Sequence, residues 1–416
     1  MFDSMNRRSF LEMGFAGGTF SLMGYLNGQE RTIPGFDQTK TDYDKTKAWR
    51  PFTDRKIRFG LVGYGVCRFA TEFDLQNHPN VEVVAVSDLF PDRCAALSKA
   101  ARCRKTYPSL EEMVKNDSIE AIFCATDAPS HAKHAVLCLE HGKHVATAVP
   151  AFYGDIEDAE RLLECCKKNS GLNYAMFETS AYHDDVYAME KIYGQNVFGK
   201  LIYSEGEYHH PHVIGEPPLD SYKGWRANGA PLWYPTHGNA YYVCITHGSL
   251  LDVSARGIEP LTGEVKPNGR GNTFRTEIGL CRTNEGGIFR MVQGGSQGEY
   301  LEAGRVRGEY AGFCSHNGRL DCNAAFVGDA TGRARLEEAI KNGMQTRKYA
   351  LPPGVSPGGH GGSHGYLGDD FVDSILRGRK PRVGVIEALN LTVPGFYAHR
   401  SASKDGETLK IPQYGL

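Results

Sequence analysis

A chain of 416 residues, of which 41% are hydrophobic, is long enough to form two domains with separate cores. The 47 lysine and arginine residues nearly balance the 49 aspartate and glutamate residues, so no nucleic-acid-binding surface is indicated. The 11 cysteines include no Cys-x-x-Cys pair and mostly fall in apolar segments, so we expect buried free thiols.

The first residues have the pattern of an export signal. Asn6-Arg7-Arg8-Ser9-Phe10-Leu11 is a twin-arginine sequence, and an uncharged, glycine-rich stretch follows at 13–26. This stretch is too short and too rich in glycine for a stable membrane span. We expect residues 1–30 to direct the folded protein through the twin-arginine route to a periplasmic or membrane-associated location. The alternative is a disordered tail on a cytoplasmic protein. Residues 31–55 are expected to form a polar linker or an arm on the surface.

From Lys56 onward, short apolar strands alternate with helical patterns. The expected strands cover 57–62, 81–87, 121–125, 144–147 and 172–177, and the expected helices cover 66–78, 91–101, 131–141 and 155–168. Such alternation predicts a parallel, doubly wound sheet. We therefore place a Rossmann domain at 56–180.

After residue 180 the pattern changes to longer segments that alternate between apolar and polar residues. A helix at 184–193 precedes expected strands at 200–209, 273–281, 287–293, 305–310 and 318–323. Their spacing by turns predicts an open, mainly antiparallel sheet. The fold class is therefore α/β, with a second α/β domain at 181–365. Helices at 369–377 and 386–401 are expected in a C-terminal segment, 366–416, that packs back on the Rossmann domain.

The turn after the first expected strand has the features of a dinucleotide site. Gly63 allows a tight turn, and Gly65 lets a pyrophosphate approach the backbone at the start of a helix. Arg68 stands where the usual fingerprint has a third glycine. Asp88 ends the second strand, where a carboxylate binds the ribose hydroxyls and repels a 2′-phosphate. We predict that the cofactor is NAD rather than NADP.

Segments of the first domain resemble the Gfo/Idh/MocA family of sugar-acting oxidoreductases, namely 57–65, 84–88, 125–134 and 142–145. The resemblance extends to the C-terminus. It implies a C-terminal domain that makes the substrate site and an oligomer contact through its open sheet. A small-molecule sugar or glycoside is the implied partner, with no nucleic acid and no integral membrane segment. The implied cofactor contacts that join Gly63, Gly65, Arg68 and Asp88 are Tyr64, Val66, Thr126, His131 and Pro150.

A second set of motifs is similar to one branch, the NAD-dependent glycosidases of glycoside hydrolase family 109. These motifs are Val149-Pro150-Ala151, Phe177-Glu178-Thr179-Ser180-Ala181-Tyr182, Trp225-Arg226, Tyr234-Pro235-Thr236-His237-Gly238 and Gly359-His360-Gly361-Gly362. The branch implies glycoside cleavage through transient oxidation at C3, elimination across C1–C2, addition of water and re-reduction.

The same resemblance assigns roles to individual residues. Tyr182 and His237 are the implied proton-transfer residues, and a neutral histidine near pH 7 suits a general base. Arg226 is suited to hold sugar hydroxyls or to polarise an oxyanion, and Trp225 to stack on a sugar face. The full set of implied substrate contacts is Trp225, Arg226, Tyr234, His210 and His360.

Two positions depart from the ordinary dehydrogenases of this family. Those enzymes carry Glu-Lys-Pro after the fourth strand, where this chain has Ala148-Val149-Pro150. They also place an aspartate four residues before the catalytic histidine, where this chain has Trp233. Both differences count against a net sugar dehydrogenase, which is the first alternative. The missing glutamate also departs from the glycosidase branch, and a catalytically inactive NAD- or sugar-binding relative is the second alternative.

The histidines at 209, 210 and 212 raise the question of a metal. Strand alternation sends His209 and His210 to opposite faces, and Pro211 interrupts the strand. No cysteine or carboxylate at suitable spacing completes a site. We expect a strand that ends at the substrate cleft, and no metal.

Overall fold

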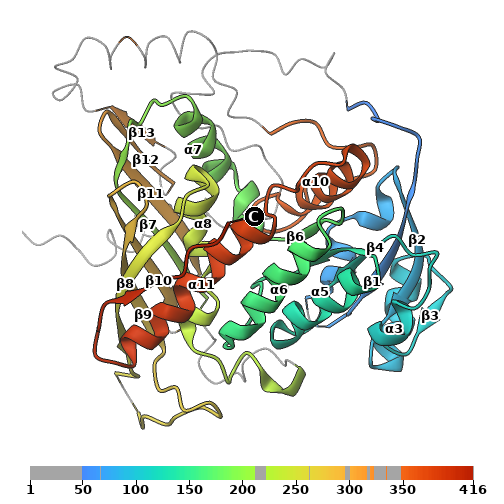
Figure 1. The fold of residues 1–416 in the computed structure, drawn as a ribbon, viewed down its shortest axis with the longest axis horizontal. Coiled ribbons are helices and arrows are strands. Elements are labelled where there is room, and N and C mark those ends of the chain that lie inside the picture. Colours follow the sequence, from blue (N-terminus) through green and yellow to red (C-terminus); the bar gives the residue numbers. More distant parts are fainter. Residues whose placement is uncertain are drawn as a thin grey trace, which may run out of the picture.

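The computed structural model describes residues 49–65, 67–210, 222–261, 263–295, 300–315, 334 and 348–415, together with the backbone of 319–322. The predicted export signal, most of the predicted arm and Val66 lie outside the described residues. The described chain forms two sheets, with helices packed between and beside them (Figure 1).

The first sheet is parallel and has the strand order β3-β2-β1-β4-β5-β6. This order is that of the doubly wound dinucleotide-binding fold, so the predicted Rossmann fold is confirmed. Its apolar strands are buried because helices cover the sheet. The strands are β1 (Ile57–Val62), β2 (Val81–Ser87), β3 (Thr106–Tyr107), β4 (Ala121–Cys124), β5 (His144–Thr147) and β6 (Tyr174–Met176). The helices of this part are α3 (Pro91–Ala100), α4 (Leu110–Met113), α5 (His131–Glu140) and α6 (Ile156–Lys168).

The predicted helix at 66–78 is wrong. Its place is taken by a short helix, α2 (Phe69–Glu72), and a 3-10 turn, η2 (Leu75–Asn77). Arg68 and Asp74 have φ angles of 50° and 57° and precede the two pieces. A left-handed residue breaks the ladder of backbone hydrogen bonds, so one helix cannot run through both positions.

The second sheet is open and has the strand order β13-β12-β11-β7-β10-β9-β8-β14. Among its described strands only β7 and β10 pair in parallel, which confirms the predicted, mainly antiparallel sheet. The strands are β7 (Leu201–His209), β8 (Leu250–Ile258), β9 (Thr276–Thr283), β10 (Ile288–Gly294), β11 (Leu301–Gly308), β12 (Ala311–Cys314), β13 (Arg319–Cys322) and β14 (Leu409–Lys410). The sequence patterns did not predict β8 or the helix before it, α8 (Thr236–Thr246).

Helices cover the inner face of this second sheet (Figure 1). α7 (Asp184–Gly194) and α8 pack together there, and α8 contacts β7. α11 (Val385–Ala402) packs against β8 and β9 on one side and against α6 and β6 on the other. A Cβ at Gly395 of α11 would lie 2.1 Å from the carbonyl oxygen of Leu232. α11 therefore binds both sheets and supports the segment that leads into α8.

The other C-terminal helix, α10 (His364–Arg377), lies on the Rossmann side (Figure 1). A Cβ at its Gly368 would lie 2.5 Å from the carbonyl oxygen of Phe73, and Phe371 packs edge to face on Phe59 of β1. The last residues of the predicted arm also lie against this domain, because the Asn80 side chain donates hydrogen bonds to the carbonyls of Thr53 and Arg55.

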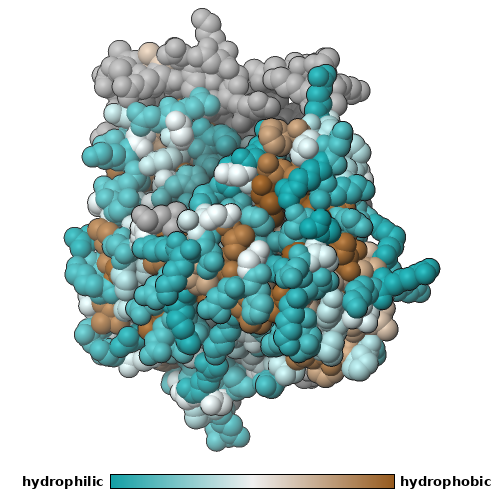
Figure 2. Space-filling model, turned by 45° about the vertical axis from the view of Figure 1, so that its right-hand side comes forward, coloured by the Kyte–Doolittle hydropathy of each residue, from teal (hydrophilic) through white to brown (hydrophobic). Residues whose placement is uncertain are grey.

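The surface seen in Figure 2 is mostly hydrophilic, with small separate apolar patches. The large side chains that are fully buried include Phe59, Phe123, Phe289 and Tyr241, which belong to the two sheets and to α8. Across the residues that the structure describes, no helix combines the length and apolar character of a membrane span.

Candidate active site

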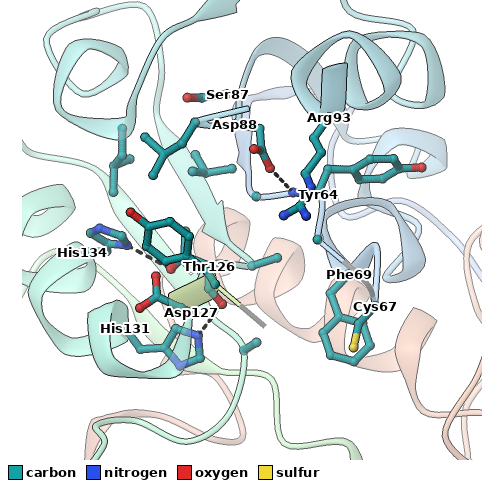
Figure 3. A pocket seen from close by; sticks show the side chains of 18 of the residues that line it. Tyr64, Cys67, Phe69, Ser87, Asp88, Arg93, Thr126, Asp127, His131 and His134 are labelled. Carbon is teal, nitrogen blue, oxygen red and sulfur yellow. Dashed lines mark hydrogen bonds between the residues drawn. The ribbon is translucent and has the colours of Figure 1, made fainter. Parts of the chain in front are cut away.

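A cavity opens at the carboxyl ends of β1, β2 and β4 (Figure 3). It encloses about 1130 Å³, open solvent at its mouth included. The structure brings ten of the predicted site residues to its wall: Gly63, Tyr64, Gly65, Arg68, Asp88, Thr126, His131, Trp225, Arg226 and Tyr234. Residues from both parts of the chain therefore share one cavity.

The two glycines of the turn have different roles in the structure. Gly63 has a φ of +92°, and a Cβ there would lie 2.4 Å from the carbonyl oxygen of Ala125. No other residue fits that position without moving β4. A Cβ at Gly65 would meet no atom within 4 Å. Gly65 therefore leaves the backbone open to a ligand in the cavity.

Asp88 ties the end of β2 to this turn. Its carboxylate accepts a hydrogen bond of 2.6 Å from the Tyr64 N–H and one of 2.8 Å from the Phe90 N–H (Figure 3). Arg68, which replaces the third glycine of the fingerprint, is exposed and precedes the short α2. Its side chain does not have to fit between helix and strand, so the glycine is not needed there.

The opposite wall of the cavity contains Thr126 and His131 (Figure 3). Thr126 Oγ1 lies 2.9 Å from His134 Nδ1. The His131 Nδ1–H donates a hydrogen bond of 2.8 Å to the carbonyl of Pro150, which does not line the cavity. Burial lowers the pKa of His131, so its ring is neutral at pH 7. Pro150 therefore does not contact the cavity, but its carbonyl holds the His131 ring in position on the cavity wall.

These features fit a bound dinucleotide. The open backbone at Gly65 suits a pyrophosphate, and the Asp88 carboxylate stands where ribose hydroxyls bind in this fold. Val66, the remaining predicted contact, lies outside the described residues.

The positions that depart from the dehydrogenase pattern are apolar in the structure as well. Ala148 and Val149 line the cavity, and no lysine is present among its described lining residues. Trp233 packs edge to face on His399 and Tyr153, with ring centroids 5.3 and 5.5 Å apart. Neither position supplies an acid or a base.

Aromatic residues lead from the cavity to His237. The Arg226 guanidinium lies 4.4 Å from the centroid of the Trp225 ring, and Tyr234 stacks on the same ring at 6.5 Å. The Tyr234 ring lies 5.4 Å from that of His237, and Tyr208 lies 4.6 Å from it on another side. His237 does not line the cavity itself but is adjacent to a residue that does.

His237 pairs with a carboxylate to which the sequence analysis assigned no role. Glu178 follows β6 and is fully buried, and its Oε1 lies 2.7 Å from His237 Nδ1. Burial alone would raise the pKa of Glu178, but the charge of His237 and its hydrogen bond hold this pKa at about 2. Burial lowers the pKa of His237, whereas the charge of Glu178 and its hydrogen bond raise it, with a net upward shift. With Nδ1 engaged by a carboxylate, Nε2 is the nitrogen left to exchange a proton.

Tyr182 is placed elsewhere. Its buried ring stacks between Tyr366 and Tyr187, at 5.7 and 6.4 Å, and the Arg382 guanidinium lies 4.8 Å above it. Burial raises the pKa of Tyr182 well above its ordinary value. The structure therefore does not bring Tyr182 to the cavity, and we expect it to support the segment of Glu178 by packing.

The two other predicted substrate contacts lie around His237. The His210 ring is 6.0 Å from that of Tyr208 and 5.8 Å from that of Tyr300. His360 Nδ1 lies 2.8 Å from His364 Nε2. Burial, followed by the charges of His364 and His237, lowers the pKa of His360 to about 3. Within the described residues, no group of three or more histidine, cysteine or acidic side chains is arranged to hold a metal ion.

Comparison with known proteins agrees with this arrangement. Residues 57–176 match the Gfo/Idh/MocA family model, described as an oxidoreductase family with an NAD-binding Rossmann fold. The chain is 29% identical to a glycosyl hydrolase family 109 protein of Bacteroides thetaiotaomicron, over 37% of this chain and 34% of the relative. It is 28% identical to an alpha-N-acetylgalactosaminidase of Bacteroides fragilis, over 44% and 46%. The match thus spans about a third to a half of these relatives.

A longer match, at 21% identity, covers 99% of this chain and 97% of a glycosyl hydrolase family 109 protein of Solibacter usitatus. Two solved structures share the fold. Levoglucosan dehydrogenase in complex with NADH and L-sorbose has a TM-score of 0.68 at 15% identity, over 86% of this chain and 100% of that one. The WlbA dehydrogenase of Bordetella pertussis, in complex with NADH and UDP-GlcNAcA, has a TM-score of 0.65 at 19% identity, over 88% and 100%. In residues 57–176 this protein therefore resembles the Gfo/Idh/MocA oxidoreductase family with its NAD-binding Rossmann fold, and the rest of the chain is similar in fold to dehydrogenases of known structure.

Proposed function

We propose that this protein binds NAD and cleaves glycosides through transient oxidation of the sugar at C3. One observation carries the proposal: the His237–Glu178 pair stands next to a dinucleotide cavity whose wall has valine where a dehydrogenase of the family has lysine. The protein would thus have a base without the lysine of net alcohol oxidation. The family 109 relatives support the same assignment.

The residues at the cavity suit the binding of the cofactor. The turn at Gly63 and Gly65 would hold the pyrophosphate, and Asp88 would bind the ribose hydroxyls. When bound, NAD supplies a hydride acceptor that later returns the hydride, so that no net oxidation results.

His237 would act as the base. Its Nε2 would remove the C2 proton, which the neighbouring C3 ketone makes acidic, and the group at C1 would leave with its bonding electrons. Glu178 would stabilise the resulting imidazolium, because a buried carboxylate 2.7 Å away favours the charged ring. Arg226 carries a positive charge that suits the developing enolate oxygen, and Trp225, which lines the same cavity, would contact the sugar ring.

A net sugar dehydrogenase remains the second candidate, because solved structures with this fold include dehydrogenases in complex with NADH and sugars. Such an enzyme would need another group to do the work of the lysine, because this chain has valine at the matching position, Val149. The inactive relative is the third candidate. It has the weakest support, because the His237–Glu178 pair combines a base with the carboxylate that orients it.

The test uses the full chain with NAD and a panel of p-nitrophenyl glycosides, beginning with the α-N-acetylgalactosaminide that the B. fragilis relative suggests. We expect release of nitrophenol without accumulation of NADH, and incorporation of deuterium at C2 when the reaction runs in D2O. Steady formation of NADH from free sugars without cleavage would support the dehydrogenase instead. Tight binding of NAD with no turnover across the panel would overturn both.

A further inference from the structure

Beyond Glu178, a second buried carboxylate lies on the Nδ1 side of His237. Glu302 comes from β11 of the open sheet, and its side chain has no exposed surface. The Ser180 hydroxyl donates a short hydrogen bond to Glu302 Oε1. The same Ser180 Oγ lies 3.1 Å from His237 Nδ1. Ser180 therefore links the carboxylate to the imidazole.

Two hydroxyl groups among the described residues donate hydrogen bonds to the Glu302 carboxylate. Besides the Ser180 hydroxyl, the Tyr300 hydroxyl donates to its Oε2 at 3.1 Å, and His183 Nδ1 lies 3.2 Å from Oε1. An ionised carboxylate accepts hydrogen bonds and donates none, so the two hydroxyl donors suit the charged form of Glu302. A buried charge of this kind needs such partners.

The direction of the Ser180 hydroxyl has a consequence for His237. Because the Ser180 proton points to Glu302, its oxygen presents a lone pair to His237 Nδ1. Glu178 Oε1 also presents an acceptor to that nitrogen. Both neighbours require a proton on Nδ1, which leaves Nε2 of the neutral ring without one.

We propose that Glu302 is a positioning residue that acts through Ser180 to keep the proton of His237 on Nδ1 and to raise its affinity for a second proton. The inference rests on the proposed function only where it treats His237 as the base. The direct contacts of Glu302 are with Ser180, Tyr300 and His183, so it would reach the reacting atoms through another residue.

The charges around His237 act on its pKa in the direction that the inference requires. The negative charges of Glu178 and Glu302 raise the pKa of His237, whereas burial and the positive charge of Arg226 lower it. Within the part of the chain that the structure describes, the charged or titratable groups around His237 are Glu178, His183, Tyr208, Arg226, Tyr234, Glu302 and His360. Glu178 and Glu302 are the two members of this set that carry a carboxyl group.

The first experiment needs no substrate. Full-length protein labelled with ¹⁵N-histidine is titrated by NMR, and the His237 signals are identified by their loss in His237→Gln. Above the midpoint of its titration, we expect the wild-type His237 ring to carry its one proton on Nδ1. In Glu302→Gln the titration midpoint of His237 should fall, and the Nε2-protonated form should appear. An unchanged midpoint and tautomer in this variant would overturn the inference.

A matched control and a rescue variant guard against a general effect of the substitution. Glu309→Gln removes the same charge just beyond β11, at an exposed position, and should leave the His237 signals unchanged. Glu302→Asp keeps the carboxylate and should retain most of the wild-type behaviour. If the aspartate variant behaves like the glutamine variant while thermal melting shows both to be folded, the charge is not what positions His237, and the inference fails.

Activity then tests whether Glu302 acts through Ser180. Glu302→Gln should lower kcat on the order of tenfold, well below the hundredfold or greater loss from removing a general base, with little change in KM. The acidic limb of kcat/KM should move to lower pH. Ser180→Ala combined with Glu302→Gln should be no worse than the poorer single variant. Full additivity would contradict the route through Ser180. If no sugar or glycoside is turned over while the NMR result holds, the proposed function fails and the positioning of His237 by Glu302 stands.

Discussion

His237 Nδ1 lies 2.7 Å from Oε1 of Glu178, and the two residues belong to different parts of the fold. Glu178 follows β6, the last strand of the Rossmann sheet, whereas His237 lies in the first turn of α8. Both side chains are buried where the two parts meet. The position of the His237 imidazole relative to the cavity at the ends of β1, β2 and β4 therefore depends on the packing between the parts, which α11 supports from both sides.

Replacement of His237 by alanine should separate cofactor binding from turnover. His237 does not line the cavity, so His237→Ala should bind NAD with wild-type affinity. Turnover should fall by roughly 10²- to 10⁴-fold, because the substrate proton loses its acceptor. The affinity is measured by calorimetry and the rate by release of nitrophenol.

His247 offers the matched control for this variant. It lies just beyond the same helix α8, is exposed, and also pairs with a glutamate, since its Nε2 lies 3.0 Å from Glu190. His247→Ala should keep wild-type turnover. Equal activity of the two alanine variants would remove His237 from the mechanism.

Much of the Rossmann sheet could be predicted, because its strands are short apolar runs that are buried on both faces. The bounds of β1, β2 and β5 agree with the sequence analysis residue for residue. α8 was missed because its residues are buried all around, which removes the amphipathic periodicity that marks a surface helix. The predicted helix at 66–78 is divided by left-handed backbone at Arg68 and Asp74. No pattern of apolar residues indicates such a break in the sequence.

The candidate site divides in the same way. Gly63, Gly65 and Asp88 follow local strand ends, so their common cavity could be expected from the order of elements. Glu302 could not be found, because the predicted strand began at residue 305 and no local pattern links β11 to His237. Glu178 lay within a quoted motif, but only the three-dimensional packing shows its carboxylate against the imidazole.

Asp88 should determine the choice of dinucleotide. In Asp88→Ala, NAD loses a charged acceptor and the turn loses its hydrogen bond to the Tyr64 N–H, so the Kd for NAD should rise about ten- to a hundredfold. The preference for NAD over NADP should shrink, because the repulsion of a 2′-phosphate is gone. Fluorescence titration with both nucleotides measures this, with the exposed Asp117→Ala as control. A wild type that prefers NADP would contradict the role of Asp88.

The two glycines of the turn should respond differently to alanine. Gly63→Ala places a methyl group 2.4 Å from a backbone oxygen at a positive φ, so the melting temperature should drop and NAD binding should weaken with it. Gly65→Ala meets no protein atom, so the melting temperature should stay near that of the wild type. Its methyl group nevertheless points into open space beside the turn, and NAD affinity should fall. If Gly65→Ala binds NAD as tightly as the wild type, the pyrophosphate does not approach this backbone.

The Glu178–His237 pair should also make the free energy of unfolding depend on pH. The pKa of Glu178 is about 2 in the folded protein, below its ordinary value of 4.5. The unfolded chain therefore binds a proton more readily at this site, and the stability that Glu178 contributes is complete above about pH 4.5 and is lost as the pH falls toward 2. His237 has the opposite sign, because its pKa is raised: its contribution is complete below 6.5 and is lost as the pH rises through the folded value.

Urea unfolding of the wild type and of Glu178→Gln across this pH range separates the pair from all other ionisable groups, because those groups are common to both proteins. The difference in unfolding free energy should be greatest between the two windows, near pH 5 to 6. It should shrink on acidification below about pH 4.5, because Glu178 of the unfolded chain takes up a proton that the folded chain does not bind. It should shrink again as the pH rises above 6.5, because His237 of the unfolded chain releases its proton before His237 of the folded chain does. The exposed Glu309→Gln should run parallel to the wild type throughout. A difference in unfolding free energy that does not vary with pH would mean that Glu178 and His237 do not attract each other as charged groups in the folded protein. Glu178 would then orient His237 only as a neutral hydrogen-bond acceptor.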